Sequence, residues 1–188
     1  MELLGNLDGN ILLWIQEFVR NPICTPFFKF ITHLGDAGVL WIAICILLLI
    51  CRKTRKVGIL CIIAILATFI VNNLILKNLV ARIRPYEVVN GLNILIARPK
   101  DLSFPSGHAA ISFAVAATIY QCLPKNKKTY GIALLVLSSL IALSRLYVGV
   151  HYPTDVLAGF TLAFGLLNVI YPTYDRIRFE WRFQSKQK

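Results

Sequence analysis

The chain has 188 residues, of which 57% are hydrophobic and 15% are charged, and its formal net charge is +11. The length fits one domain, and the mean hydropathy of +0.67 excludes an ordinary soluble domain and predicts an integral membrane protein. The positive charge does not predict nucleic-acid binding, because the basic residues lie mostly in short loops between apolar runs.

The N-terminal region, residues 1–36, differs from the rest of the chain. No cleavable signal peptide is predicted, because Glu2, Asp8 and Glu17 stand where a basic start and an unbroken apolar stretch would be. Apolar residues recur at helical spacing over residues 1–20, which predicts an amphipathic helix at the membrane interface. Residues 22–34 are apolar but short, and the sequence leaves open whether they dip into the membrane or complete a sixth span.

Five later segments are apolar enough for membrane spans, although the first is short, since a crossing helix needs about 20 mostly apolar residues. They are residues 37–51, 57–76, 105–122, 130–147 and 154–172. We therefore expect an all-α, polytopic transmembrane bundle of five to six spans. Its expected parts are N-terminal interfacial helices (1–36), a transmembrane core (37–173) and a basic cytoplasmic tail (174–188).

Basic residues follow the first, third and last of these spans. If the five spans alternate, all three clusters face one side, which the positive-inside rule makes the cytoplasmic side. Residues 77–104 and 148–153 then face outward, yet the first of these segments retains several cations. Cations on the outer side run against the positive-inside rule, so their presence indicates a function, and phosphate binding is one such function.

Tryptophans and cysteines have ordinary structural interpretations. Trp14, Trp41 and Trp181 lie near predicted interfaces, where tryptophan anchors membrane proteins. The five cysteines are scattered without metal-ligand spacing, and we expect buried, inert thiols and no disulfide framework; they are residues 24, 45, 51, 61 and 122.

The first chemistry-bearing segment runs from Lys77 to Pro85. Lys77 and Arg84 are seven residues apart, so on a continuous helix they would share a face two turns apart, and Pro85 would help to end that helix. The alternative is a pair of cations that snorkel at a helix end.

The second segment is Phe104-Pro105-Ser106-Gly107-His108, at the start of a span. Proline and serine are typical of helix starts, and the free N–H groups of a helix N-terminus bind anions. Gly107 permits a close approach of a ligand, and His108 in the first turn is placed to donate a proton. The alternative is a capped helix with an interfacial histidine.

The third segment runs from Ser144 to Asp155. Pro153 suits the first turn of the last helix, which puts His151 just before that helix and Asp155 just inside it. The carboxylate is then close enough to accept from one imidazole nitrogen and leave the other free as a nucleophile. The alternative is a structural histidine–aspartate pair.

Together the three segments read Lys-x6-Arg-Pro, Pro-Ser-Gly-His and Ser-Arg-x5-His-x3-Asp, each at a span boundary on one side. This order resembles the signature of the type-2 phosphatidic acid phosphatase family, the membrane lipid phosphate phosphatases related to vanadium haloperoxidases. Every fixed position matches over residues 77–155, whereas residues 1–36 lie outside the signature.

The resemblance implies a role for each matching residue. His151 would attack phosphorus and form a phosphohistidine, Asp155 would orient it, and His108 would protonate the leaving oxygen and then activate water. The remaining positions would bind the phosphate; they are Lys77, Arg84, Ser106, Gly107 and Arg145. Neither a cofactor nor a metal is expected, since three fixed cations supply the charge stabilisation and no compact set of Asp, Glu and His appears.

Other polar residues rank lower as site candidates. Three of them lie beside the motifs, where they would tune the pocket: Arg82, Tyr86 and Tyr147. Four others we interpret as solvated or interfacial groups: Glu87, Asp101, His33 and Asp36.

The sequence thus predicts an integral membrane phosphatase whose partners are the bilayer and a lipid phosphate or diphosphate. Undecaprenyl diphosphate is the leading expectation, because small chains of this kind resemble undecaprenyl-diphosphate phosphatases, and a site that opens on the outer face of a bacterial-type cytoplasmic membrane suits that role. Phosphatidylglycerophosphate or phosphatidic acid is the alternative within the class, and a non-catalytic lipid-phosphate binding or transport protein is the alternative outside it. A haloperoxidase-like redox enzyme is a weaker alternative, because it would need bound vanadate.

Overall fold

The computed structural model describes residues 2–184, and within that range all regular secondary structure is helical, without a strand. The α-helices are α1 (Glu2–Trp14), α2 (Cys24–Leu34), α3 (Val39–Ile50), α4 (Arg55–Phe69), α5 (Lys77–Val80), α6 (Pro85–Val88), α7 (Gly107–Cys122), α8 (Lys128–Tyr147) and α9 (Pro153–Gln184). Two π-helical segments, η1 (Ile15–Val19) and η3 (Ile70–Leu76), and two short 3-10 turns, η2 (Asp36–Gly38) and η4 (Lys125–Lys127), join them. The predicted all-α class is confirmed.

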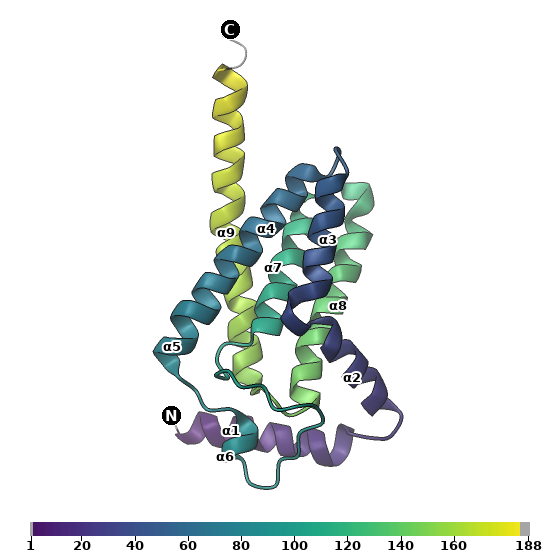
Figure 1. Ribbon diagram of the computed structural model, residues 1–188, viewed down its shortest axis with the longest axis vertical. Helices are drawn as coiled ribbons and strands as arrows, with labels where there is room; N and C mark the ends of the chain where they lie inside the picture. The colour runs from purple at the N-terminus through teal and green to yellow at the C-terminus, as the bar shows by residue number, and fades with distance from the viewer. Residues whose placement is uncertain (1, 185–188) are drawn as a thin grey trace.

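Helix α7 is the centre of the bundle, and it packs against α4, α8 and α9 (Figure 1). Five of its buried positions are alanines, although Phe113, Val115 and Ile119 are buried as well; the alanines are Ala109, Ala110, Ala114, Ala116 and Ala117. Small residues let helices approach closely when no hydrophobic effect between helices drives packing in lipid. Of the three apolar core clusters in the described chain, two include residues of α7.

Two glycines set how closely α7 meets its neighbours. A Cβ at Gly131 of α8 would lie 2.8 Å from the Cα of Tyr120. A Cβ at Gly159 of α9 would lie 2.7 Å from the carbonyl oxygen of Ser106. The absence of a side chain at Gly159 lets the start of α7 lie directly against α9. At the same place the amide of Ser106 donates to the carbonyl oxygen of Asp155 at 3.0 Å. Two of the three sequence motifs are thereby joined.

By length and apolarity, three helical stretches of the described chain could each cross a membrane: Arg55–Val88, Lys125–Tyr147 and Pro153–Pro172. The bent pair Cys24–Leu34 and Asp36–Ile50 would make a fourth. Helix α7 has 16 residues, which is about 24 Å at 1.5 Å per residue and short of the hydrocarbon core. The count of five to six spans and the three part boundaries therefore stay predictions.

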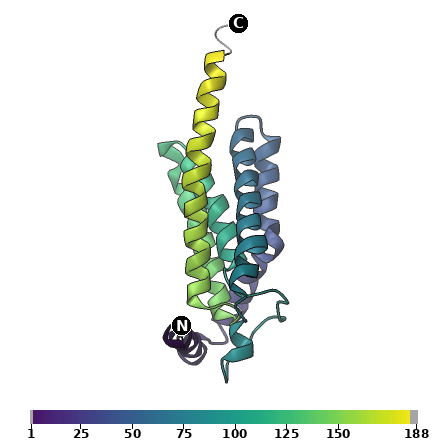
Figure 2. The same ribbon diagram turned by 90° about the vertical axis from the view of Figure 1, so that its left-hand side faces the viewer.

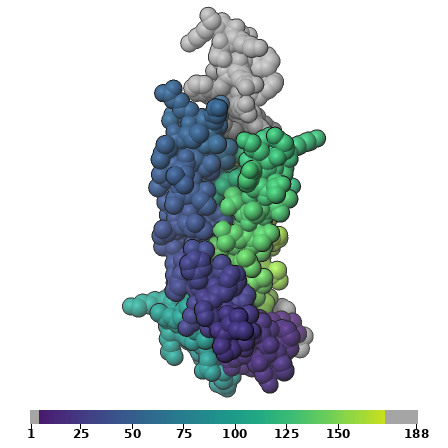
Figure 3. All heavy atoms as spheres, turned by 90° about the vertical axis from the view of Figure 1, so that its right-hand side faces the viewer, coloured from purple at the N-terminus to yellow at the C-terminus, as the bar shows by residue number. Residues whose placement is uncertain are grey.

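Helix α1 lies across one end of the bundle, beside the loop that carries α6 (Figures 1 and 2). Leu12 is buried against the core, whereas Leu7, Trp14 and Phe18 are exposed. This two-sided helix suits an interfacial position. Figure 3 shows the N-terminal segment and the loop that follows α5 at the same end of the molecule.

The prediction for Trp41 is wrong, and the prediction of five buried thiols is right for Cys45 and Cys61 and not for the other three. Trp41 is fully buried, and its Nε1 donates to the Oγ of Ser112 on α7 at 2.8 Å, so it is a core residue. Cys51 is exposed, Cys24 and Cys122 are partly buried, and Cys45 and Cys61 are buried. Trp14 is exposed, as an anchor would be, and Trp181 lies in the part of α9 whose side chains the structure does not describe. Of the predicted tail, residues 185–188 lie outside the described chain.

Candidate active site

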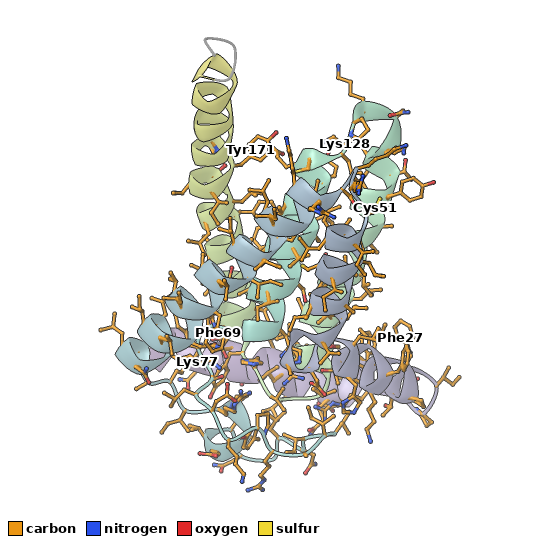
Figure 4. All side chains as sticks on the ribbon, turned by 45° about the horizontal axis from the view of Figure 1, so that its top comes forward. Phe27, Cys51, Phe69, Lys77, Lys128 and Tyr171 are labelled. Atoms are coloured by element: carbon orange, nitrogen blue, oxygen red, sulfur yellow. The ribbon has the colours of Figure 1, made fainter. Side chains whose placement is uncertain are left out.

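A cavity of about 470 Å³ opens at the end of the bundle where α5 ends and α7 begins. Its polar lining includes five of the predicted site side chains, namely Lys77, Arg84, His108, Arg145 and His151, together with Gly107. Apolar residues complete it, among them Phe69 and Ile111. Figure 4 shows Lys77 and Phe69 at the end opposite to Cys51 and Lys128. A volume of this size is typical of a ligand site.

Lys77 and Arg84 reach the cavity by a different route from the one predicted. Helix α5 ends at Val80, Ala81 adopts a left-handed conformation with φ 48°, and residues 81–84 are not helical. Arg84 is extended, as a residue before proline prefers to be, and Pro85 begins α6 instead of ending a helix. The two cations therefore converge through a break in the helix and not through a shared helical face.

Arg145 points into the cavity from the last turn of α8, and it is 3% exposed. Its Nη1 donates to the Oγ1 of Thr32 at 2.6 Å. Its buried Nε has no hydrogen-bond partner within the described part of the chain. A buried guanidinium donor without an acceptor costs free energy, so this atom is suited to an incoming anion.

His151 is held between a cation and a carboxylate. Its Nδ1 lies 3.3 Å from Oδ2 of Asp155, and its Nε2 lies 3.4 Å from Nη1 of Arg84. Arginine can only donate, so Nε2 is the acceptor and the proton belongs on Nδ1. Burial lowers the pKa of His151 to about 3; the hydrogen bond that Nδ1 donates to Asp155 opposes this shift, and the charges of Arg84 and Arg145 add to it. The imidazole is therefore neutral near pH 7, with a lone pair on Nε2.

Asp155 is fully buried behind His151 and does not line the cavity. Its Oδ2 accepts from the Oγ of Ser103 and from the amide of Tyr152, the latter at 2.9 Å. Its Oδ1 accepts from Nη1 of Arg82 at 2.8 Å. These donors hold the carboxylate in one orientation, which in turn fixes the imidazole.

His108 lines the cavity from the first turn of α7, where a carboxylate that sequence reasoning set aside contacts it. Its Nε2 lies 3.1 Å from Oδ1 of Asp36, and Oδ2 of Asp36 accepts from Nδ1 of His33 at 2.7 Å. Both His33 and Asp36 line the cavity, so the interpretation of them as merely interfacial groups is wrong. In the sequence Asp36 is a lone carboxylate between two apolar runs, and this pattern is only a weak indication of a site residue.

Asp101 was also misjudged, because it is an ion-pair partner and not a freely solvated charge. Its carboxylate pairs with Nζ of Lys77 and with Nη2 of Arg84, the latter at 2.7 Å. Burial opposes ionisation of Asp101, but the hydrogen bond from Lys77 and the charge of Arg84 outweigh it and lower the pKa to about 2. Glu87 is exposed, as predicted.

Ser106 and Gly107 have different roles, although both were expected to bind the phosphate. Ser106 is fully buried and is the N-cap of α7, with its Oγ accepting from the amide of Ala109 at 3.5 Å. Gly107, the first residue of α7, lines the cavity, so the free N–H groups of the helix start face it. The structure brings Gly107 to the cavity and leaves the Ser106 side chain in the helix cap.

The three residues that were expected to tune the pocket, namely Arg82, Tyr86 and Tyr147, do not line the cavity and contact neighbouring segments instead. The hydroxyl of Tyr86 donates to the carbonyl oxygen of Pro99 at 2.7 Å. Tyr147 stacks on Phe28 with centroids 4.2 Å apart. Arg82 turns away from the cavity toward α1 and α9. Among the side chains that the structure describes, those of residues 5–172, no cluster of three His, Cys, Asp or Glu could hold a metal ion.

This arrangement defines an all-helical protein with a cationic cavity, a buried neutral histidine paired with a carboxylate, and a second histidine beside another carboxylate. The sequence model of the PAP2 superfamily matches residues 56–179, and the chain belongs to this family. The resemblance drawn from the three motifs is therefore confirmed.

Relatives of known name agree with this assignment. The chain is 40% identical over 167 residues to an undecaprenyl-diphosphatase of Sulfolobus acidocaldarius, an alignment that covers 86% of this chain and 78% of the relative. It is 32% identical over 178 residues to phosphatidylglycerophosphatase B of Bacillus subtilis, with coverage of 89% and 82%.

Solved structures share the fold. The crystal structure of a transmembrane PAP2-type phosphatidylglycerolphosphate phosphatase from Bacillus subtilis superposes with a TM-score of 0.76 at 28% identity. That superposition covers 94% of this chain and 89% of the other. Aquifex aeolicus LpxE gives a TM-score of 0.75 at 26% identity, with coverage of 87% and 93%.

Proposed function

We propose that this protein is a membrane phosphatase that hydrolyses a lipid phosphate or diphosphate through a phosphohistidine. The observation that carries the proposal is the placement of His151, whose Nε2 faces a cavity lined by four cations, Arg98 among them, while Nδ1 contacts Asp155. The names of the PAP2 relatives support the same activity.

In the first step, Nε2 of His151 attacks phosphorus and the bond from phosphorus to the leaving oxygen breaks. The electron pair stays on that oxygen, which takes a proton from His108. Lys77, Arg84 and Arg145 balance the charge on the phosphoryl oxygens, and the N–H groups at the start of α7 add hydrogen bonds. Asp155 stabilises the positive charge that develops on His151.

In the second step, water attacks the phosphohistidine and gives a proton to His108. The phosphorus–nitrogen bond breaks, its electron pair returns to Nε2, and inorganic phosphate leaves. His108 therefore acts first as acid and then as base, so a single residue serves both steps.

The first substrate candidate is undecaprenyl diphosphate, supported by the relative from Sulfolobus acidocaldarius that matches at 40% identity. Phosphatidylglycerophosphate is the second candidate, supported by the Bacillus subtilis relative and by the solved structure that carries that name. Apolar lining residues such as Phe69 suit a lipid whose tail stays in the bilayer while its headgroup enters the cavity.

Orientation belongs to the same proposal. Cys51 and Lys128, which border the two basic loops of the sequence, lie at the end of the bundle opposite to Lys77 (Figure 4). The positive-inside rule then makes the cavity end the outer face of the cytoplasmic membrane, with the C-terminus cytoplasmic.

The test is phosphate release from a panel of lipid phosphates and diphosphates by the purified protein in lipid nanodiscs, with His151→Ala as the control. We expect release that depends on His151 and an acid-labile phosphoprotein that the variant lacks. Release that is unchanged in His151→Ala would refute the mechanism. Lipid binding without turnover would instead support the non-catalytic alternative.

A further inference from the structure

Helix α1 contributes a buried carboxylate next to the catalytic machinery. Helix α1 lies across the end of the bundle (Figure 1), and its Asp8 is only 2% exposed. Its Oδ1 accepts from the amide of Thr154 at 3.3 Å, and its Oδ2 accepts from the Oγ1 of the same residue. Thr154 is in the first turn of α9, so Asp8 satisfies a free N–H group at the start of the helix that carries Asp155.

Arg82 joins that carboxylate to the one behind the nucleophile. Its Nη2 donates to Oδ2 of Asp8 at 2.7 Å, and its Nη1 donates to Oδ1 of Asp155 at 2.8 Å. The guanidinium carbon lies 3.8 Å from the ring centroid of Tyr152. The planar, forked donor set of arginine bridges two carboxylates in a fixed geometry, which a lysine ammonium cannot reproduce.

The position of Arg82 excludes it from phosphate binding. The left-handed turn at Ala81 separates it from Lys77, and Arg82 does not line the cavity. A partly buried arginine between two buried carboxylates is costly to desolvate, so it is expected to have a specific role. Its contacts lead away from the substrate and end on Asp155.

We propose that Asp8 and Arg82 are positioning residues for His151. They hold the Asp155 carboxylate in the one orientation that accepts from Nδ1. The Nε2 lone pair of His151 is thereby directed into the cavity. The line of contacts Asp8–Arg82–Asp155–His151 makes α1 part of the framework of the active site and not only a membrane-facing helix. This inference rests on the proposed role of His151 as the nucleophile.

The test uses the full chain in nanodiscs and compares Arg82→Gln, Arg82→Lys and Asp8→Asn with the wild type on a short-chain lipid phosphate. We expect Arg82→Gln to lower kcat by about 10- to 100-fold, as the loss of a supporting hydrogen-bond partner does. KM should change less than about threefold, because the cations that bind phosphate remain. Arg82→Lys keeps the charge and should recover part of the loss, and Asp8→Asn should lose less than Arg82→Gln.

A double variant tests whether Asp8 acts through Arg82. If it does, Asp8→Asn combined with Arg82→Gln has the same kcat as Arg82→Gln alone, since the effects of coupled residues are not additive. Nitrogen-15 NMR of histidine-labelled protein adds a direct measurement. The wild type should show His151 protonated on Nδ1, and Arg82→Gln should show a mixture of tautomers.

Arg20→Gln is the matched structural control. Arg20 also ties the N-terminal segment to this end of the molecule, through the carbonyl oxygens of Tyr147 at 2.8 Å and Asn93 at 2.6 Å, but it does not contact Asp155. This variant should lower thermal stability and leave the tautomer of His151 unchanged. If Arg82→Gln does not fold, kcat and the His151 tautomer of Arg82→Lys and Asp8→Asn are compared with those of Arg20→Gln instead.

The outcomes separate this inference from the function it rests on. If the wild type forms no phosphohistidine, the proposed function fails. If the wild type forms it, but Arg82→Lys, Asp8→Asn and any folded Arg82→Gln keep the wild-type kcat and His151 tautomer, the positioning role of Asp8 and Arg82 is overturned. A fall in kcat that Arg20→Gln matches, together with an unchanged tautomer, would equally overturn it.

Discussion

Asp101 binds Arg84 twice, through its carboxylate to Nη2 and through its carbonyl oxygen to Nε, both at 2.7 Å. The same carboxylate pairs with Lys77. Two of the three cations assigned to phosphate binding are therefore already bound to an anion of the chain itself. A phosphate that enters the cavity has to displace this carboxylate or share its partners.

Asp101→Asn should therefore tighten the binding of phosphate. We expect the inhibition constant of inorganic phosphate to fall a few-fold, as the loss of a competing, partly exposed ion pair worth up to about 1 kcal/mol would produce. The measurement is inhibition of lipid phosphate hydrolysis at several phosphate concentrations. Glu87→Gln, which removes an exposed charge near the same loop, is the control and should change nothing. Weaker inhibition in Asp101→Asn would mean that Asp101 holds the cations in place.

The ionisation of His151 gives a pH prediction with a definite sign. Its pKa is about 3 in the folded protein and about 6.5 in an unfolded chain. The unfolded chain therefore binds more protons between these values, so this residue lowers stability as the pH falls from about 6.5 toward 3. We expect phosphohistidine formation in rapid-quench experiments to stay independent of His151 protonation down to about pH 4. An NMR titration midpoint of His151 near 6.5 would contradict this.

Much of the local chemistry could be predicted from the sequence because it depends on short-range geometry. His151 and Asp155 are four residues apart across a helix start, and the contact between them follows from that spacing. The cap at Ser106 is equally local. The helix predicted through Lys77 and Arg84 failed, because the left-handed Ala81 interrupts it, and an alanine gives no signal for such a turn.

The carboxylates around the site depend on long-range packing, and this is why sequence reasoning missed them. Asp36 and His108 are 72 residues apart, and Asp8 and Arg82 are 74 apart. Nothing in the pattern of either segment indicates the partner. The same holds for Trp41, which is apolar and near a span end like an anchor, but finds its acceptor on the facing α7.

Asp36→Asn should impair protonation of the leaving group, because the contact of Asp36 with Nε2 of His108 orients that imidazole. We expect kcat to fall by about tenfold or more on an alkyl phosphate, within the range of general acid catalysis. On p-nitrophenyl phosphate, whose leaving oxygen needs no proton, the loss should be much smaller. His33→Gln removes the other partner of Asp36 and should have a smaller effect on this ratio. Equal losses on both substrates would argue against a role in acid catalysis.

Gly35→Ala should displace His108 without unfolding the bundle. A Cβ at this position would lie 2.5 Å from Cδ2 of His108 and 2.8 Å from Cγ2 of Ile141. The imidazole has to move, and a shift of about 1 Å is enough to cost on the order of 100-fold in rate. Gly165→Ala, at a position in α9 with nothing within 4 Å, is the control, and a gain of about 0.5–1 kcal/mol in stability is expected there. The readouts are kcat and thermal unfolding; wild-type activity in Gly35→Ala would show that His108 tolerates displacement.

The orientation can be tested with a cysteine that the chain already has. Cys51 is exposed at the end of the bundle opposite to Lys77 (Figure 4). In a variant with its other four cysteines replaced by alanine, Cys51 should resist a membrane-impermeant maleimide added to intact cells and react once the membrane is opened. A cysteine-free chain with Glu87→Cys places a thiol in the exposed loop near the cavity, and it should react in intact cells. The reverse pattern would put the cavity on the cytoplasmic side, and substrates presented at the inner leaflet would then replace those proposed.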